Sequence, residues 1–340
     1  MNSRSRMSLV TASLAAVAWV SIGCNQENAP STPNSVPPFW ESTGGPTEGG
    51  SVLSIAIDSG EYAFAGMENG AVFRMPSEGG NWLQVASLPP EVRALVINSS
   101  SQLVAGTGAN PFFSNDTGNT WTQGTMGLPG YPNSVLTFAI DSKGDIYTGS
   151  LFYDEASGGV SRSTDNGASW TLQGLSLRHV YSVARNSIGT MFAGARGGFP
   201  AVQGGVFRST DNGISWSLAN SGLPDEIIWS LTFNSSGHIF AGTDGSGVFR
   251  STDNGENWIQ VSSGLTSTIL RAIVINSIGH LFAATPGGVF RSTNNGTDWL
   301  QLNTGLIDIS IMSLTIDSPG SIFAGSETAG IFRSVESTVP

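Results

Sequence analysis

Short apolar runs alternate with turn-forming segments along most of the chain. The clearest unit begins at 228–233, where apolar and polar residues alternate as they do in a half-buried strand. Turn residues follow at 234–237, and further short runs occupy 239–242, 248–251 and 258–261. This pattern predicts four strands in a repeating unit of about 40 residues, separated by Gly-, Ser- and Asn-containing turns. No segment beyond the first 23 residues has a helical period.

An octapeptide with the pattern S-x-D-x-G-x-x-W separates the third and fourth predicted strands. Its clearest copy is 251–258, and it recurs at 163–170, 209–216 and 292–299, with looser copies at 114–121 and 75–82. The short acid is expected to accept hydrogen bonds from turn N–H groups, while Gly supplies an unusual backbone angle and Trp an apolar anchor. We therefore interpret these positions as structural: Asp116, Asp165, Asp211, Asp253 and the equivalent Asn294.

The two ends of the repeat array complement each other. First strands are predicted to begin near Val52, Val92, Val135, Val180, Ile228, Leu270 and Ile311, which makes seven units. The seventh unit lacks a Trp strand, whereas Trp40 lies in such a strand with no unit before it. We therefore expect an all-β, seven-bladed β-propeller of four-stranded blades over residues 39–335, with a tail at 336–340. The Trp40 strand completes the last blade, so that the ring has no open edge.

The octapeptides resemble the Asp-box, or BNR repeat, and the resemblance covers residues 39–335. This motif occurs in bacterial sialidases, xyloglucan-cleaving endoglucanases, sortilin-type receptors and photosystem II stability/assembly factor-like proteins. In those families it is structural and lies on the blade periphery, away from the ligand site. The resemblance therefore implies a propeller and leaves open whether the protein is an enzyme or a binding protein.

Residues 1–23 have the features of an export signal. Arg4 and Arg6 precede an apolar run at 9–20, which is too short to span a bilayer comfortably. Cys24 follows directly and resembles the lipidated cysteine of a bacterial lipobox, although Ser21 stands where an aliphatic residue is usual. We expect an exported cell-envelope lipoprotein of the outer membrane or cell surface, with secretion as the alternative. The polar, Pro-rich segment 24–38 is then its flexible tether.

Charge and composition narrow the possible partners. Only 11% of residues are charged, the formal net charge is −11, and Lys143 is the single lysine. Such a chain argues against binding to nucleic acid or anionic lipid, so contact with a membrane is expected only through the lipid anchor. We expect a monomer without a cofactor. A metal site is not expected either, because His179 has no second histidine nearby.

The candidate site lies on the face where the first strands begin. The second residues of these strands are expected to form a ring: Leu53, Arg93, Leu136, Tyr181, Trp229, Arg271 and Met312. Longer loops carry unusual residues over blades three to five, which gives nine candidate ligand-binding residues: Arg93, Phe152, Tyr153, Arg178, Tyr181, Arg196, Phe199, Trp229 and Arg271. Aromatic faces with arginine suit a glycan or a protein partner. Alternatively, Tyr181 and Trp229 pack between blades, and Arg93 and Arg271 pair with Glu91 and other acids at the rim.

These observations favour a non-catalytic scaffold that binds a protein or glycan over blades three to five. The alternative is a glycoside hydrolase, either sialidase-like or endoglucanase-like. A sialidase-like site needs three arginines, a tyrosine nucleophile with a partner glutamate, and an acid/base aspartate, whereas the more usual glycosidase needs two carboxylates about 5–9.5 Å apart. Asp154 or Glu155 facing Asp225 or Glu226 is the candidate set, whereas the arginine-bearing motif near the N-terminus of sialidases is absent.

Overall fold

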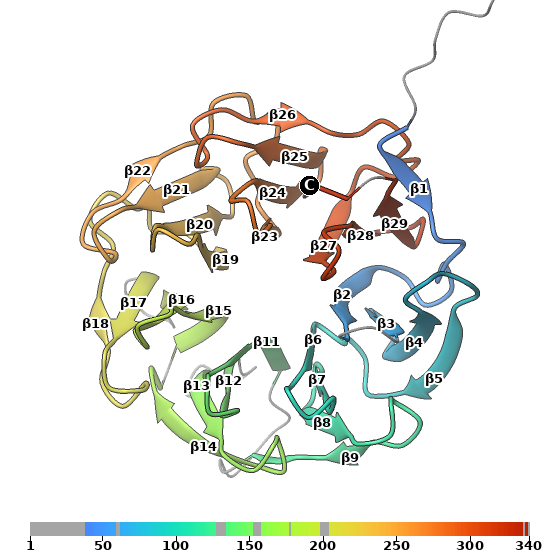
Figure 1. The fold of residues 1–340 in the computed structure, drawn as a ribbon. Coiled ribbons are helices and arrows are strands. Elements are labelled where there is room, and N and C mark those ends of the chain that lie inside the picture. The colour runs from blue at the N-terminus through green and yellow to red at the C-terminus, as the bar shows by residue number, and fades with distance from the viewer. Residues whose placement is uncertain are drawn as a thin grey trace, which may run out of the picture. The chain divides into compact units, whose positions relative to one another are not determined.

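The computed structural model describes residues 38–58, 62–126, 134–151, 158–176, 178–197, 204–335 and 337–338. These residues form a ring of seven antiparallel sheets (Figure 1) and contain no helix, so none that could span a membrane. The prediction of an all-β, seven-bladed propeller is confirmed. The predicted leader, tether and Cys24 lie outside the described residues.

Each blade runs outward from an innermost first strand (Figure 1). Blades one and two contain β2 (Val52–Ile57), β3 (Tyr62–Met67), β4 (Ala71–Pro76) and β5 (Leu83–Ser87), then β6 (Ala94–Ile97), β7 (Leu103–Gly106), β8 (Pro111–Ser114) and β9 (Thr122–Gln123). Blades three and four contain β11 (Ser134–Ile140), β12 (Ile146–Leu151), β13 (Gly158–Ser163) and β14 (Ser169–Gly174), then β15 (Arg178–Arg185), β16 (Met191–Gly197), β17 (Gly205–Ser209) and β18 (Ser217–Leu218).

The remaining three blades follow the same order. Blades five and six contain β19 (Ile228–Phe233), β20 (Ile239–Thr243), β21 (Val248–Ser251) and β22 (Ile259–Gln260), then β23 (Ala272–Ile275), β24 (Leu281–Thr285), β25 (Gly288–Ser292) and β26 (Leu300–Gln301). Blade seven contains β27 (Ile311–Ile316), β28 (Ile322–Ser326) and β29 (Ile331–Ser334), with β1 (Trp40–Ser42) outermost. A short strand, β10 (Thr125–Met126), pairs in parallel with β14 at the rim of blade three.

The N-terminal strand closes the ring, as the sequence predicts. β1 pairs antiparallel with β29, in a register that places Trp40 opposite Ser334. Trp40 is 1% exposed, and its indole N–H donates to the Leu302 carbonyl of blade six at 2.6 Å. The last blade thus gains its fourth strand from the other end of the described chain.

The hydrophobic core is divided among the seven contacts between neighbouring blades. A phenylalanine of the second strand recurs in these contacts and is at most 1% exposed in five blades: Phe64, Phe192, Phe240, Phe282 and Phe323. The contact between blades four and five is typical, because Phe192 packs there with Ile239, Phe249 and Trp258. Each blade is therefore stabilised by apolar contact with both neighbours and not by a core of its own.

The octapeptide is a hydrogen-bonded turn, as its residue types predict. Asp253 accepts bonds from the Asn257 N–H at 2.9 Å and from the Ser251 hydroxyl at 2.8 Å. The chain turns through positive φ at Asn254 and Gly255, which glycine adopts with little strain. In the variant copy, the Asn294 amide oxygen likewise accepts a bond from the Asp298 N–H.

The Trp-led fourth strand is shorter than the sequence predicts. β22 contains only Ile259–Gln260, because the Trp258 N–H donates to Ser221 in the preceding blade at 2.8 Å. The Trp258 indole also crosses to that blade and donates to the Ala219 carbonyl at 2.9 Å. Trp299 repeats both contacts one blade further, with Ser263 and Val261. These tryptophans therefore link neighbouring blades.

Candidate binding site

A backbone irregularity at the start of the inner strands positions the candidate site. In five blades the pairing of the first strand with the second shifts by one residue, as in a β-bulge, leaving an unpaired residue: Leu53, Leu136, Tyr181, Trp229 and Met312. In blades two and six, the equivalent Arg93 and Arg271 directly precede the strand, and their N–H groups donate to Gly106 and Ala284. The same backbone position is thus presented seven times.

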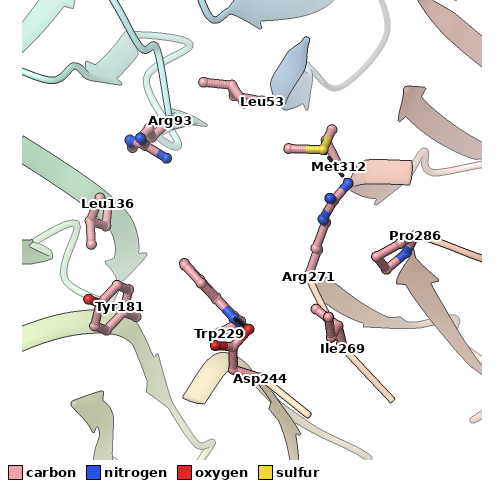
Figure 2. Close-up of a pocket in the computed structure, with 10 residues that line it drawn as sticks. All are labelled: Leu53, Arg93, Leu136, Tyr181, Trp229, Asp244, Ile269, Arg271, Pro286 and Met312. Carbon is pink, nitrogen blue, oxygen red and sulfur yellow. Dashed lines mark hydrogen bonds between the residues drawn. The ribbon is translucent and has the colours of Figure 1, made fainter. Parts of the chain in front are cut away.

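All seven of these residues line one cavity of about 390 Å³. We call them the ring residues, and Figure 2 shows them around this cavity, with Asp244, Ile269 and Pro286 completing the lining. The three added residues belong to turns and loops of blades five and six, which defines the cavity face of the propeller. The turns between first and second strands lie on the opposite face, where Asp58, Asn98 and Asp317 contribute to a separate cavity.

Two aromatic ring residues contact each other at the wall of the cavity. The rings of Tyr181 and Trp229 meet edge to face, with 4.9 Å between their centroids. The Trp229 indole N–H donates to Asp244 at 3.0 Å, which fixes the orientation of the indole. Burial raises the pKa of Tyr181, so its hydroxyl stays protonated at neutral pH. The two residues therefore pack between blades and also line the cavity.

The two arginines of the ring differ in their partners. Arg93 forms an ion pair with Glu91, with 2.8 Å between Nη2 and Oε1, as the alternative interpretation expected. Arg271 instead donates to neutral groups, namely the Ser310 hydroxyl at 3.1 Å and the Met312 sulfur. Burial lowers the pKa of Arg271, and the nearby carboxylates Glu327 and Asp308 oppose that shift. Arg271 is thus a half-buried cation without a bonded carboxylate in the described part of the chain.

The other predicted arginines do not line the cavity. Arg178 lies over the Phe207 ring, 4.3 Å from its centroid, at the core between blades three and four. Arg196 pairs in register with His179 and, after burial, is the second cause that lowers the pKa of that histidine. The positive charge of Arg196 also lowers the pKa of Tyr181, against the larger opposite effect of burial. The three remaining candidates fall outside the described residues: Phe152, Tyr153 and Phe199.

The carboxylates considered for glycoside hydrolysis are only partly described. Asp225 accepts a bond from the Gly204 N–H at 3.1 Å. Glu226 accepts bonds from the Ser246 N–H at 3.1 Å and from its hydroxyl at 2.7 Å. Asp154 and Glu155 lie outside the described residues. Across the described ranges, no group of three or more His, Cys, Asp or Glu is placed to hold a metal ion.

Three lining residues were not predicted from the sequence. Asp244 belongs to the turn between β20 and β21, and Pro286 to the turn between β24 and β25. Ile269 lies in the loop before β23 and forms a bridge with Asp244. A search of the second-to-third-strand turns for residues that break the repeat would have found Pro286, since no other described turn of this kind starts with proline.

Comparisons with known proteins show the fold. No protein-family model and no curated protein matches the chain. The structure of YCF48 bound to D1 peptide is similar with a TM-score of 0.68 at 16% identity, over 88% of this chain and 97% of that one. PorZ, a surface component of the type-IX secretion system of Porphyromonas gingivalis, is similar with a TM-score of 0.66 at 14% identity, over 86% of this chain and 47% of that one. Virginiamycin B lyase from Staphylococcus aureus is similar with a TM-score of 0.66 at 13% identity, over 84% of this chain and 95% of that one.

Identities this low relate the architecture and not the activity of these proteins. The similar structures include a peptide-bound protein, a secretion-system surface component and a lyase, so the same ring supports binding and catalysis. The function of this chain must therefore be argued from the side chains around its central cavity.

Proposed function

We propose that the protein is an exported, non-catalytic propeller that binds a protein or glycan partner at the central cavity. The observation that carries this proposal is the ring itself. Seven equivalent backbone positions converge on one cavity, yet they hold five residue types, including two arginines and a contacting Tyr–Trp pair. Residues that served only the scaffold would repeat from blade to blade, as the octapeptide does.

The architecture of similar proteins supports binding. YCF48 has been seen with a peptide and PorZ is a surface component, which agrees with an exported binding role for this chain. We assign the octapeptides to the Asp-box class and Cys24 to a lipid anchor on the sequence resemblance. Arg178, Arg196, Phe152, Tyr153 and Phe199 remain proposed contacts of the partner.

The proposal predicts that Tyr181→Ala with Trp229→Ala removes capture of the partner, because the two rings form the aromatic wall of the cavity. The measurement is a pull-down from a surface extract with wild type and the double variant, with captured glycans and proteins both identified. A control on the outer rim is Leu218→Ala with Ile259→Ala, which removes two exposed side chains of comparable hydrophobicity from blades four and five.

Equal capture by wild type and the Tyr181/Trp229 variant would place the site elsewhere and leave these aromatics as packing between blades. Turnover of a captured glycan by the wild-type protein would replace the binding function with glycoside hydrolysis.

A further inference from the structure

The wall of the cavity formed by blades five to seven is aliphatic, in contrast to the aromatic wall over blades four and five. Ile269 lines the cavity and is 40% exposed. Ile307 and Ile309, in the loop between β26 and β27, are 82% and 46% exposed. Ile309 directly precedes Ser310, which accepts the bond from Arg271, so the loop that carries these isoleucines reaches the ring at that point. Exposed isoleucines occur elsewhere too, Ile188 among them, so these three are of interest for their place beside Arg271 and not for their exposure alone.

Arg271 lines the cavity between Ile269 and Met312, and among the described residues no carboxylate is bonded to it. Its bonded neighbours are Ser310, the Ile311 carbonyl and Met312, all of them neutral. The two nearby carboxylates are bonded to other groups. Glu327 accepts from the Ser310 hydroxyl, and Asp308 accepts from the Thr328 N–H and hydroxyl at 2.7 and 2.8 Å. A half-buried guanidinium with neutral partners favours binding of a carboxylate supplied from outside.

We propose that the surface formed by Ile269, Arg271, Ile307, Ile309 and Met312 binds a protein segment in which an acidic residue lies between apolar ones. The carboxylate pairs with Arg271, and the flanking apolar side chains pack on the isoleucines. Arg and Met, which occur together on this surface, are among the residue types enriched at protein interfaces. Aliphatic walls suit apolar side chains better than sugars, whose hydroxyl groups need polar partners. This inference rests on the proposed binding function and names the class of partner.

The test starts from a display library of random short peptides, selected on the full chain, with a glycan array probed in parallel. Selected peptides are expected to share a Glu or Asp flanked by apolar residues. Replacing that acid by its amide should weaken binding to wild type roughly ten- to hundredfold, the range of a hydrogen bond to a charged group. Binding is measured by calorimetry with the synthetic peptides.

Arg271→Gln tests the charge directly. This variant should weaken binding of the acidic peptide by the same factor and leave binding of the amide peptide unchanged, because only the acidic peptide pairs with the guanidinium. Arg271→Lys retains the charge and should keep part of the preference, which separates loss of the cation from loss of folding. The melting temperature of each variant is measured alongside.

Ile307→Ser tests the apolar contact, and the chain offers a matched control. Ile188 is 80% exposed, close to the 82% of Ile307, but it lies in the turn between β15 and β16 on the opposite face. Ile307→Ser should weaken peptide binding several-fold, whereas Ile188→Ser should not change it.

The outcomes separate this inference from the function on which it rests. Glycan ligands that are lost with the Tyr181/Trp229 variant, without any acidic peptide, would overturn the inference and keep the cavity as the site. Peptides whose affinity responds to neither Arg271→Gln nor Ile307→Ser would also overturn it. If the affinity of these peptides is also unchanged in the Tyr181/Trp229 variant, the cavity is not the binding site.

Discussion

At the scale of the residue, the acid at the third position of the octapeptide takes its properties from its hydrogen bonds. Bonds from the Asn257 N–H, the Asn257 amide and the Ser251 hydroxyl lower the pKa of Asp253 to about 2. The pKa values of Asp116 and Asp211 are lowered to about 2 in the same way, first by a threonine or serine hydroxyl. Asp253 is exposed and Asp116 and Asp211 are partly exposed, so water screens these charges and their effect is local.

The variant copy suggests a compensated exchange. Asn294 donates its amide to Asp298 at 2.9 Å, so acid and amide have changed places relative to Asp253 and Asn257. Asp253→Asn alone should lower the free energy of unfolding by about 0.5–1 kcal/mol, the low end for a hydrogen bond because water screens the site. Adding Asn257→Asp should restore it. Urea denaturation measures both, and a double variant no better than the single one would contradict the pairing.

The same variant has a predictable dependence on pH. A carboxyl with a pKa of about 2 when folded and about 3.9 when unfolded stabilises the fold above pH 4. That stabilisation is lost as the pH falls through 2. The difference in unfolding free energy between wild type and Asp253→Asn should therefore shrink as the pH falls from 4 to 2. A difference that stayed constant over this window would show that the charge of Asp253 plays no part.

At the scale of the element, glycines allow each blade to lie close to the next tryptophan. A Cβ on Gly222, Gly264 or Gly305 would lie 2.1–2.3 Å from the carbonyl oxygen of Trp258, Trp299 or Trp40. These glycines also have positive φ, between 89 and 101°. The close approach lets the tryptophan N–H groups reach the preceding blade, so the glycine and the tryptophan form one device.

Gly264→Ala should therefore cost more than the change in backbone angle alone. Gly279 is a matched control, because its φ of +84° is close to the +89° of Gly264 and no atom lies within 4 Å of its would-be Cβ. We expect Gly279→Ala to lower the free energy of unfolding by about 1 kcal/mol. Gly264→Ala should lower it by at least about twice that amount, since the new methyl group must displace Trp299. Equal losses in urea denaturation would show that the contact with Trp299 is not a constraint.

The extent to which the site follows from sequence depends on the same elements. The ring residues were predictable because the repeat aligns the inner strands, and equivalent backbone positions point toward the same axis. Asp244 and Ile269 were not, because their places depend on how two loops from neighbouring blades pair. Arg178 lies only three residues before Tyr181, yet its side chain covers the core at Phe207. The alternation of residues along a strand predicts on which side of the sheet a side chain lies, but it does not predict which residue that side chain contacts.

At the scale of the whole molecule, the ring depends on contact between the two ends of the described chain. Trp40 joins β1 to blade six as well as to β29, and its side chain is buried among Phe282, Ile311 and Phe332. Because each blade is stabilised by its neighbours, a defect at this contact affects the ring as a unit.

Trp40→Ala is thus expected to lower the free energy of unfolding by about 3–5 kcal/mol, as for other buried tryptophans. Trp121→Ala serves as the comparison, since Trp121 is only partly buried and its indole donates to Gly118 of its own octapeptide. A smaller loss is expected there. If the two variants unfolded at the same urea concentration, closure at β1 would not be a main source of stability.

The proposed anchor also belongs to this scale. Cys24→Ala should move the protein from the membrane fraction to the soluble fraction or block its processing, because the lipid would have no attachment point. Fractionation of wild type and variant by centrifugation measures this. Unchanged membrane association with normal processing would exclude Cys24 as the anchor.

The bulge at the inner strands has a consequence for how such a protein evolves. Leu, Arg, Tyr, Trp and Met occupy the same backbone position in different blades, and serines that directly follow this position also join the blades. Ser54 and Ser182, for example, donate to the next blade at Val92 and Ile228, each at 2.8 Å. A mutation at a ring residue that makes no bond to the next blade can therefore change the cavity without loosening the scaffold, whereas Tyr181, Trp229 and Arg271 serve both. The positions around this opening thus form a combinatorial surface, on which some changes of specificity also carry a cost in stability.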